Sequence, residues 1–219
     1  MTGRDVGPAT RRLPMFPLGT VLFPGSLLPL HVFEPRYRAM MGDCLAGDRR
    51  FGVVLISRGS EVGGGDERVG VGTEAVIEAA RPFDDGRWGL LARGCGRIEV
   101  VAWLEDAPYP VALVRDLADL HEDAGAPGPA TPTVEAAAAA VARVRALASE
   151  LGRPVDTGGG FGAEDDAGTP TADRLWRLCA EAPLGPFDRQ RLLEANGTER
   201  PALLAELATA LGDDLAALL

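Results

Sequence analysis

Apolar residues in the stretch 13–30 occur in short pieces that prolines and glycines separate. Prolines at this density exclude a helix and favour short or edge strands joined by turns. The pattern predicts a strand over residues 27–33, and Pro35 marks its end because the residue before a proline avoids the helical region. Proline is favoured in the first turn of a helix, so the apolar stripe that follows predicts a helix. The stripe consists of Tyr37, Met40, Met41, Cys44 and Leu45.

Apolar positions in the stretch 51–114 alternate with a period of two, which indicates strands. Turn signals rich in glycine and aspartate interrupt these runs about every ten residues, and Asp85-Gly86 is the strongest hairpin signal among them. This spacing is typical of a small sandwich or barrel of roughly six strands. Residues 1–120 are therefore predicted to form a β-rich subdomain with one early helix.

The second part of the chain is predicted to be helical. Residues 121–132 are rich in glycine, proline, alanine and acids and have no periodicity, so we interpret them as a linker. Residues 133–219 show helical spacing of apolar residues, which predicts a small C-terminal helical bundle. A glycine- and aspartate-rich tract over 154–170 interrupts it, and we expect a flexible loop there. The predicted fold class is α+β.

Composition narrows the possible chemistry. The chain has a formal net charge of -10 and contains no lysine, so all 22 of its basic residues are arginines. A Walker-type phosphate loop, Schiff-base chemistry and a Ser-Lys dyad each need a lysine, so these mechanisms are excluded. Residues 1–118 carry 14 arginines against 15 acids, and the remainder is acidic. Nucleic-acid binders usually show a basic excess, and we therefore expect no nucleic-acid partner.

The cysteines and the N-terminal residues indicate the compartment. Cys44, Cys95 and Cys179 show no zinc-type spacing, and we interpret them as buried free thiols in a reducing environment. Residues 1–12 lack the apolar core of a secretory signal, and no apolar run approaches the ~18 residues of a membrane span. We expect a cytoplasmic protein with no membrane partner, no metal and no cofactor.

Two motifs with possible catalytic or nucleotide-binding roles also have structural explanations. Residues 70–75 fit a dinucleotide-binding loop, but the pattern after them has the period of a strand, so no helix begins there to bind a phosphate. His31 and Glu34 precede the predicted helix, where a structural histidine and a carboxylate that pairs with an arginine are expected. A small-molecule sensor or hydrolase that uses His31 and Glu34 is the alternative.

The motifs of the first part resemble the Lon N-terminal domain. The most specific motif is Leu28-Pro-Leu-His-Val-Phe-Glu-Pro-Arg-Tyr-Arg38. The others are Leu13-Pro-Met-Phe-Pro-Leu18, Val21-Leu-Phe-Pro-Gly25, Phe51-Gly-Val-Val-Leu55, Val71-Gly-Thr73, Gly94-Cys-Gly-Arg97 and Trp103-Leu-Glu-Asp-Ala-Pro-Tyr109. The resemblance covers residues 13–118, and the helical remainder is similar to the helical half of stand-alone members of that family.

The resemblance implies a PUA-like β pseudobarrel followed by helices, which serves full-length Lon proteases as a recognition module for protein substrates. Because the chain has no lysine for ATPase or Ser-Lys chemistry, we expect a stand-alone, non-enzymatic form. A classification of this chain as peptidase S16-like would reflect only the shared domain and not proteolytic activity. The implied partners are unfolded or extended protein segments. A PUA-like RNA binder is a further alternative.

The expected binding surface is an exposed apolar patch near the proline-bounded N-terminal stretch, since such short pieces cannot all turn inward on one small barrel. An incompletely paired strand edge there could add backbone hydrogen bonds to an extended peptide. The candidate ligand-binding residues are Phe16, Phe23, His31, Glu34, Arg36, Tyr37, Trp103 and Tyr109.

Overall fold

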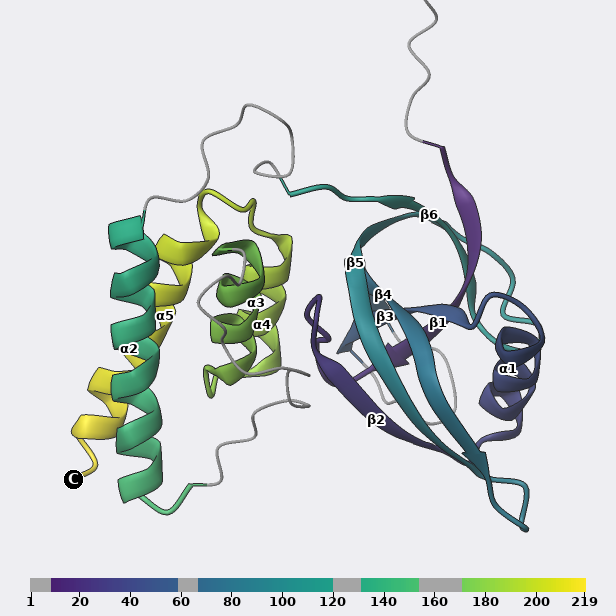
Figure 1. Ribbon diagram of the computed structural model, residues 1–219, viewed down its shortest axis with the longest axis horizontal. Coiled ribbons are helices and arrows are strands. Elements are labelled where there is room, and N and C mark those ends of the chain that lie inside the picture. The colour runs from purple at the N-terminus through teal and green to yellow at the C-terminus, as the bar shows by residue number, and fades with distance from the viewer. Residues whose placement is uncertain (1–8, 59–66, 120–130, 154–170) are drawn as a thin grey trace, which may run out of the picture.

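The computed structural model describes residues 9–58, 67–119, 131–153 and 171–219, and it contains a sheet and a group of helices that lie side by side (Figure 1). The strands are β1 (Arg11–Leu18), β2 (Leu27–Val32), β3 (Arg50–Arg58), β4 (Glu67–Pro82), β5 (Trp88–Trp103) and β6 (Val111–Asp116). The helices are α1 (Pro35–Ala46), α2 (Thr131–Glu150), α3 (Thr171–Glu181), α4 (Pro186–Glu194) and α5 (Arg200–Ala216). The predicted α+β class is confirmed.

The strands form one mixed sheet in the order β2-β5-β4-β3-β1-β6, and β5 also pairs with β6. β1 and β3 run parallel, and the other pairs are antiparallel. β5 spans 16 residues, of which the first part pairs with β2 and the last part with β6. β2 pairs only with β5 among the described strands, so it lies at an edge of the sheet.

The pseudobarrel that the resemblance implied is not confirmed, because the structure has a six-stranded mixed sheet with β2 at its edge. The turn spacing along the chain indicates only which consecutive strands can form hairpins. The parallel β1–β3 pair joins residues 15–18 to residues 52–55, with β2 and α1 between them in the sequence. A pairing of this kind leaves no turn signal, so the spacing of turns could not give the arrangement of the sheet.

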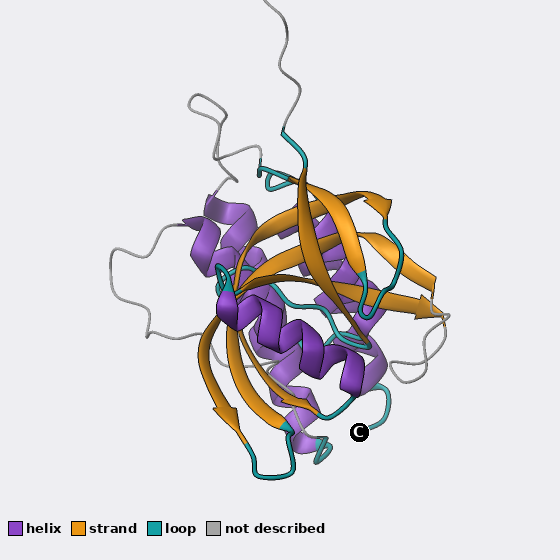
Figure 2. Cartoon of the chain, turned by 90° about the vertical axis from the view of Figure 1, so that its right-hand side faces the viewer, coloured by secondary structure: helices purple, strands orange, loops and turns teal. Residues whose placement is uncertain are grey.

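The early helix forms where the apolar stripe predicts it. α1 begins at Pro35 and buries Tyr37, Met40, Met41 and Cys44. These side chains share one apolar cluster with Phe16 of β1 and with residues of β3, β4 and β5. α1 therefore covers the end of the sheet that faces away from the other helices (Figures 1 and 2).

Helices α2 to α5 lie on the opposite side of the sheet and share a core with it. Phe23, which follows β1, belongs to the same apolar cluster as Trp176 of α3, and the centroids of the two rings are 5.7 Å apart. α2 begins at Thr131, inside the predicted linker 121–132. The rest of that linker and the whole of the predicted loop 154–170 lie outside the described residues, so these boundaries stay predictions.

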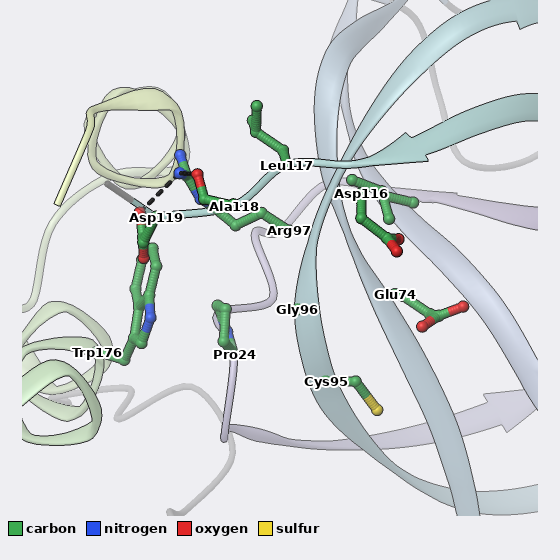
Figure 3. A pocket seen from close by; sticks show the side chains of 11 residues that line it. Pro24, Glu74, Cys95, Gly96, Arg97, Asp116, Leu117, Ala118, Asp119 and Trp176 are labelled. Carbon is green, nitrogen blue, oxygen red and sulfur yellow. Dashed lines mark hydrogen bonds and ion pairs between the residues drawn. The ribbon is translucent and has the colours of Figure 1, made fainter. Parts of the chain in front are cut away.

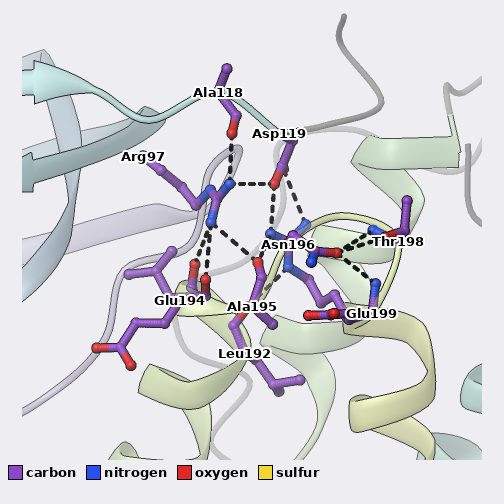
Figure 4. Close-up of polar contacts among 11 residues, drawn as sticks. Arg97, Ala118, Asp119, Leu192, Glu194, Ala195, Asn196, Thr198 and Glu199 are labelled. Atoms are coloured by element: carbon purple, nitrogen blue, oxygen red, sulfur yellow. Dashed lines mark hydrogen bonds and ion pairs between the residues drawn. The ribbon is translucent and has the colours of Figure 1, made fainter. Parts of the chain in front are cut away.

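A buried carboxylate joins the sheet to the helices (Figure 4). Asp119 Oδ1 accepts from Arg97 of β5 at 2.6 Å and from Arg200 of α5 at 2.7 Å. Both guanidinium groups also donate to the Ala195 carbonyl after α4, at 3.2 Å from Arg97 and 2.6 Å from Arg200. The Arg200 guanidinium lies 3.7 Å from the centroid of the Trp176 ring. We call these residues the Arg97–Asp119–Arg200 cluster.

None of the helices in the described ranges is both long enough and apolar enough to cross a membrane.

Candidate functional site

An apolar hollow of about 230 Å³ lies beside β2. β1 contributes Phe16 and Leu18, α1 contributes Tyr37, and residues 29–34 form the other wall. The sequence sets this arrangement locally, because Pro35 begins α1 directly after β2 and so brings Tyr37 close to the strand. The hollow brings together four of the predicted site residues, namely Phe16, His31, Glu34 and Tyr37.

An aromatic stack forms one wall of this hollow, and an ion pair lies next to it. The ring centroids of Phe16 and Tyr37 are 4.1 Å apart, with an angle of 10° between the planes. Arg36 places its guanidinium carbon 4.5 Å from the centroid of Tyr37, and its Nε donates to Glu34 Oε2 at 3.0 Å. Phe16 and Tyr37 are buried, whereas Phe33 at the rim exposes 56% of its surface.

A second apolar hollow, of about 300 Å³, lies at the same edge of the sheet. Leu90 packs with the cluster of Phe16 and Tyr37, so the next residue of β5, Leu91, lines this hollow from the other face of the sheet. Phe83 lies over Gly89, where a Cβ would come within 3.3 Å of the ring. The His31 ring meets Phe83 edge-on, with 5.5 Å between the centroids. Leu30 of β2 borders both hollows, so the two apolar surfaces are continuous along β2. We call the two hollows and the outer edge of β2 the β2 surface.

The structure places the other predicted site residues elsewhere. Phe23 is fully buried against Trp176. The guanidinium carbon of Arg68 lies 4.6 Å from the ring centroid of Trp103, which is at the end of β5. Tyr109 donates to Asp43 Oδ2 of α1 at 2.6 Å. Arg36 borders the first hollow only through its ion pair with Glu34.

A third cavity, of about 370 Å³, lies between the sheet and the helices (Figure 3). Its charged side chains are paired within the protein. Glu74 accepts from Arg11 and from Arg50, each at 2.8 Å, and the other wall belongs to the Arg97–Asp119–Arg200 cluster. The ion pairs of Glu74 lie within the sheet, whereas the Arg97–Asp119–Arg200 cluster holds the two parts of the chain together.

The cysteines differ in exposure. Cys44 and Cys179 are buried as predicted, and burial raises the pKa of each thiol to about 12. Cys95, which lines the third cavity, is exposed, contrary to the prediction, and partial burial of its thiol raises its pKa. No cluster of three or more potential metal ligands occurs in the described part of the chain.

Several residues of the β2 surface are not among the predicted site residues, and Phe33, Arg81 and Phe83 are three of them. A signal for the two phenylalanines exists. Each lies at the end of an extended run next to a proline or an aspartate turn, where the alternating pattern gives it no inward position. Arg81 has no such signal, because its place depends on the pairing of β4 with β5.

The chain is similar to known Lon proteins over most of its length. The family model for the ATP-dependent protease La (LON) substrate-binding domain matches residues 12–205. The Lon protease 2 of Herpetosiphon aurantiacus is 34% identical over 116 residues, which are 52% of this chain and 14% of that protein. The Lon protease 2 of Myxococcus xanthus is 33% identical over 109 residues, which are 49% of this chain and 13% of that protein. The chain thus spans about one seventh of the length of these curated relatives.

Solved structures show the same fold. The Lon N-terminal domain protein from Xanthomonas campestris has 26% sequence identity and a TM-score of 0.64, and the match covers 90% of this chain and 98% of that one. The N-terminal domain of the Mycobacterium avium complex Lon protease has 16% identity and a TM-score of 0.56, over 91% of this chain and 98% of that one, and supports the fold alone. The family model covers far more than half of the chain, and the chain belongs to the family of LON substrate-binding domains.

Proposed function

We propose that this chain is a non-catalytic protein-binding module that takes up exposed, extended apolar segments of other proteins at the β2 surface. The observation that carries the proposal is the pair of apolar hollows on either face of an edge strand, with Phe33 and Phe83 exposed by 56% and 39% at their rims. A continuous exposed apolar surface with a charged rim is the usual mark of a protein-binding site.

Family membership supports a role in binding proteins, since the matching family model is described as a substrate-binding domain. The lysine-free sequence supports a non-catalytic role for this chain, because nucleotide hydrolysis of the Walker type and Ser-Lys proteolysis both need that residue. Free thiols in the described residues suit a reducing compartment such as the cytoplasm.

The alternative of a sensor or hydrolase has one observation in its favour, because His31 and Glu34 line the same hollow. Their side chains are already engaged, however. Glu34 accepts from Arg36, and the His31 ring contacts Phe83. These contacts suit a structural role at the rim better than proton transfer.

An RNA-binding role would need several arginines on one face that are available to phosphates. More than half of the 22 arginines instead form ion pairs with described carboxylates. These arginines are Arg11, Arg36, Arg50, Arg68, Arg87, Arg93, Arg97, Arg115, Arg143, Arg145, Arg174, Arg191 and Arg200. Their charge is balanced locally, which favours a protein partner.

Fluorescence anisotropy with a labelled unfolded polypeptide and a labelled single-stranded RNA, each at low and high salt, tests the proposal. We expect about micromolar binding of the polypeptide with weak dependence on salt, because the contact is mainly apolar. Nucleic-acid binding would weaken steeply with salt. Salt-sensitive capture of RNA without binding of the polypeptide would refute the proposed function.

A further inference from the structure

We propose that the bound segment joins the sheet as an additional strand along the outer edge of β2, and that it is a run of consecutive apolar residues next to a carboxylate that reaches Arg81. This inference rests on the proposed function and adds the conformation and chemistry of the partner. The bound segment would thus resemble a strand that is buried in a folded protein and becomes exposed on unfolding. It would not resemble an amphipathic helix.

The backbone of β2 shows which of its groups are available. Just before the strand, the Gly94 N–H donates to the Ser26 carbonyl at 2.9 Å. In an antiparallel pair such bonds recur at every second residue, so Leu28, Leu30 and Val32 direct their backbone groups toward β5. Leu27, Pro29 and His31 direct theirs outward. Proline has no N–H, and its position in β2 is one at which no ladder bond to β5 is lost.

No described residue bonds to these outward groups. They comprise the N–H and C=O groups of Leu27 and His31 and the C=O group of Pro29. An extended chain laid along this edge can satisfy them with its own backbone, which gives affinity without reading the sequence of the partner.

The two hollows define the side chains of the partner. Side chains of an added strand alternate between the two faces of the sheet. On one face they meet Phe16, Leu18 and Tyr37, and on the other they meet Leu91 and Phe83. Because both faces are apolar, the preferred segment is apolar at consecutive positions, as in a strand buried on both sides.

The charge of Arg81 determines which charge the partner should carry. It lines the second hollow, and its guanidinium carbon lies 5.9 Å from the centroid of the Phe83 ring. Arg87, whose guanidinium carbon lies 6.0 Å from the same ring centroid, pairs with Asp85 at 2.6 Å, whereas Arg81 forms no ion pair with any carboxylate in the described ranges. A carboxylate next to the apolar run complements this charge.

A set of synthetic peptides tests strand addition directly. The parent is a short run of valine, isoleucine and leucine with an aspartate at one end, and each variant carries one N-methylated backbone amide. We expect affinity to fall about tenfold at every second position, where the amide donates to β2, and to change little at the positions between. A peptide of the same composition in the order of an amphipathic helix should bind more weakly than the parent.

Protein variants provide a second, independent test. His31→Pro removes an outward N–H, and His31→Ala removes the same side chain but keeps that N–H. His31→Pro is expected to bind the parent peptide about tenfold more weakly than His31→Ala. Arg81→Glu should lower the affinity for the peptide that ends in aspartate. Binding to this variant should be restored when lysine replaces the aspartate in the peptide. Arg12→Glu on β1 is the matched control.

The outcomes separate this inference from the proposed function. Binding of the parent peptide without a period-two N-methyl effect would refute strand addition and leave the protein-binding role in place. An equal decrease in affinity in His31→Ala and His31→Pro would assign the effect to the side chain. This result would also refute strand addition. No binding of any peptide or unfolded polypeptide would overturn both.

Discussion

At the scale of single residues, a close approach of two backbone segments positions the loop that leads into β2. A Cβ at Gly94 of β5 would lie 2.4 Å from the carbonyl oxygen of Phe23. Gly94 also exchanges hydrogen bonds with the backbone of Gly25 and Ser26, both at 2.9 Å. The absence of a side chain at this position therefore lets the loop lie on β5, with Phe23 directed into the core.

Gly94→Ala is expected to lower the free energy of unfolding by about 1–3 kcal/mol, because the methyl group forces the loop away from β5. Gly96→Ala is the matched control on the same strand, since nothing lies within 4 Å of a Cβ there. Urea unfolding of the two variants measures the difference. Equal stability of the two variants would show that the loop moves without cost.

Tyr109 links the loop before β6 to α1 and makes stability depend on alkaline pH. Burial, together with the hydrogen bond to Asp43, raises its pKa from 10.0 to about 12. A raised pKa in the folded state means that the contribution to stability is complete below about pH 10 and is lost as the pH rises through about 12.

Tyr109→Phe removes the hydroxyl and keeps the ring. We expect the wild-type protein to be more stable than this variant at about pH 8, and the difference to disappear as the tyrosine ionises. Unfolding by urea at a series of pH values gives both stabilities. A difference that stays constant up to about pH 12 would contradict the role given to the Asp43 bond.

At the scale of elements, the Arg97–Asp119–Arg200 cluster fixes α4 and α5 against β5. The carboxylate of Asp119 balances two guanidinium groups that are almost fully buried, with side-chain exposures of 4% and 1%. Removal of one partner from a buried ion pair leaves an uncompensated charge, which is far more costly than loss of an exposed pair.

Asp119→Ala is therefore expected to destabilise the protein by about 3–5 kcal/mol. Glu135→Ala is the control, because its ion pair with Arg174 joins α2 and α3 at the surface. Thermal unfolding should show a large decrease in Tm for the first variant and little change for the second. Similar values for both would mean that the buried cluster does not hold the elements together.

The elements also show what the sequence could predict. α1 follows directly from its apolar stripe and from Pro35, because both signals are local. The parallel β1–β3 pair and the edge position of β2 depend on contacts between distant segments and could not be predicted from periodicity.

The same limit applies to the site. Three of the candidate residues, His31, Glu34 and Tyr37, line one hollow because β2 and α1 adjoin in sequence, and their role in binding stays a prediction. Phe23 was expected near the surface but is buried, because the helices that cover it come much later in the chain. Which apolar residues of the N-terminal stretch remain exposed is decided by this tertiary packing.

At the scale of the whole molecule, the sheet and the helices share an apolar cluster. Val21, Phe23 and Leu55 from the first part pack with residues of α2 to α5. A core that crosses the boundary couples the stability of the two parts. The chain is thus expected to unfold as one unit although its sequence suggests two subdomains.

We expect far-UV circular dichroism, which follows mainly the helices, and tryptophan fluorescence to give the same unfolding midpoint in urea. Phe23→Ala should shift both curves together and cost about 3–5 kcal/mol, because the ring is fully buried. Two separate transitions in the wild-type protein would contradict the shared core.

The central claim is that the β2 surface, and not exposed apolar area in general, binds extended protein segments. Phe33 and Phe187 allow a matched comparison, since they are exposed by 56% and 61% and lie at the β2 surface and on α4. The most direct test is the affinity of a labelled unfolded polypeptide for Phe33→Ser and Phe187→Ser, measured by anisotropy. The account predicts about tenfold weaker binding for Phe33→Ser and unchanged binding for Phe187→Ser. Equal affinities of the two variants, or a larger loss for Phe187→Ser, would contradict it.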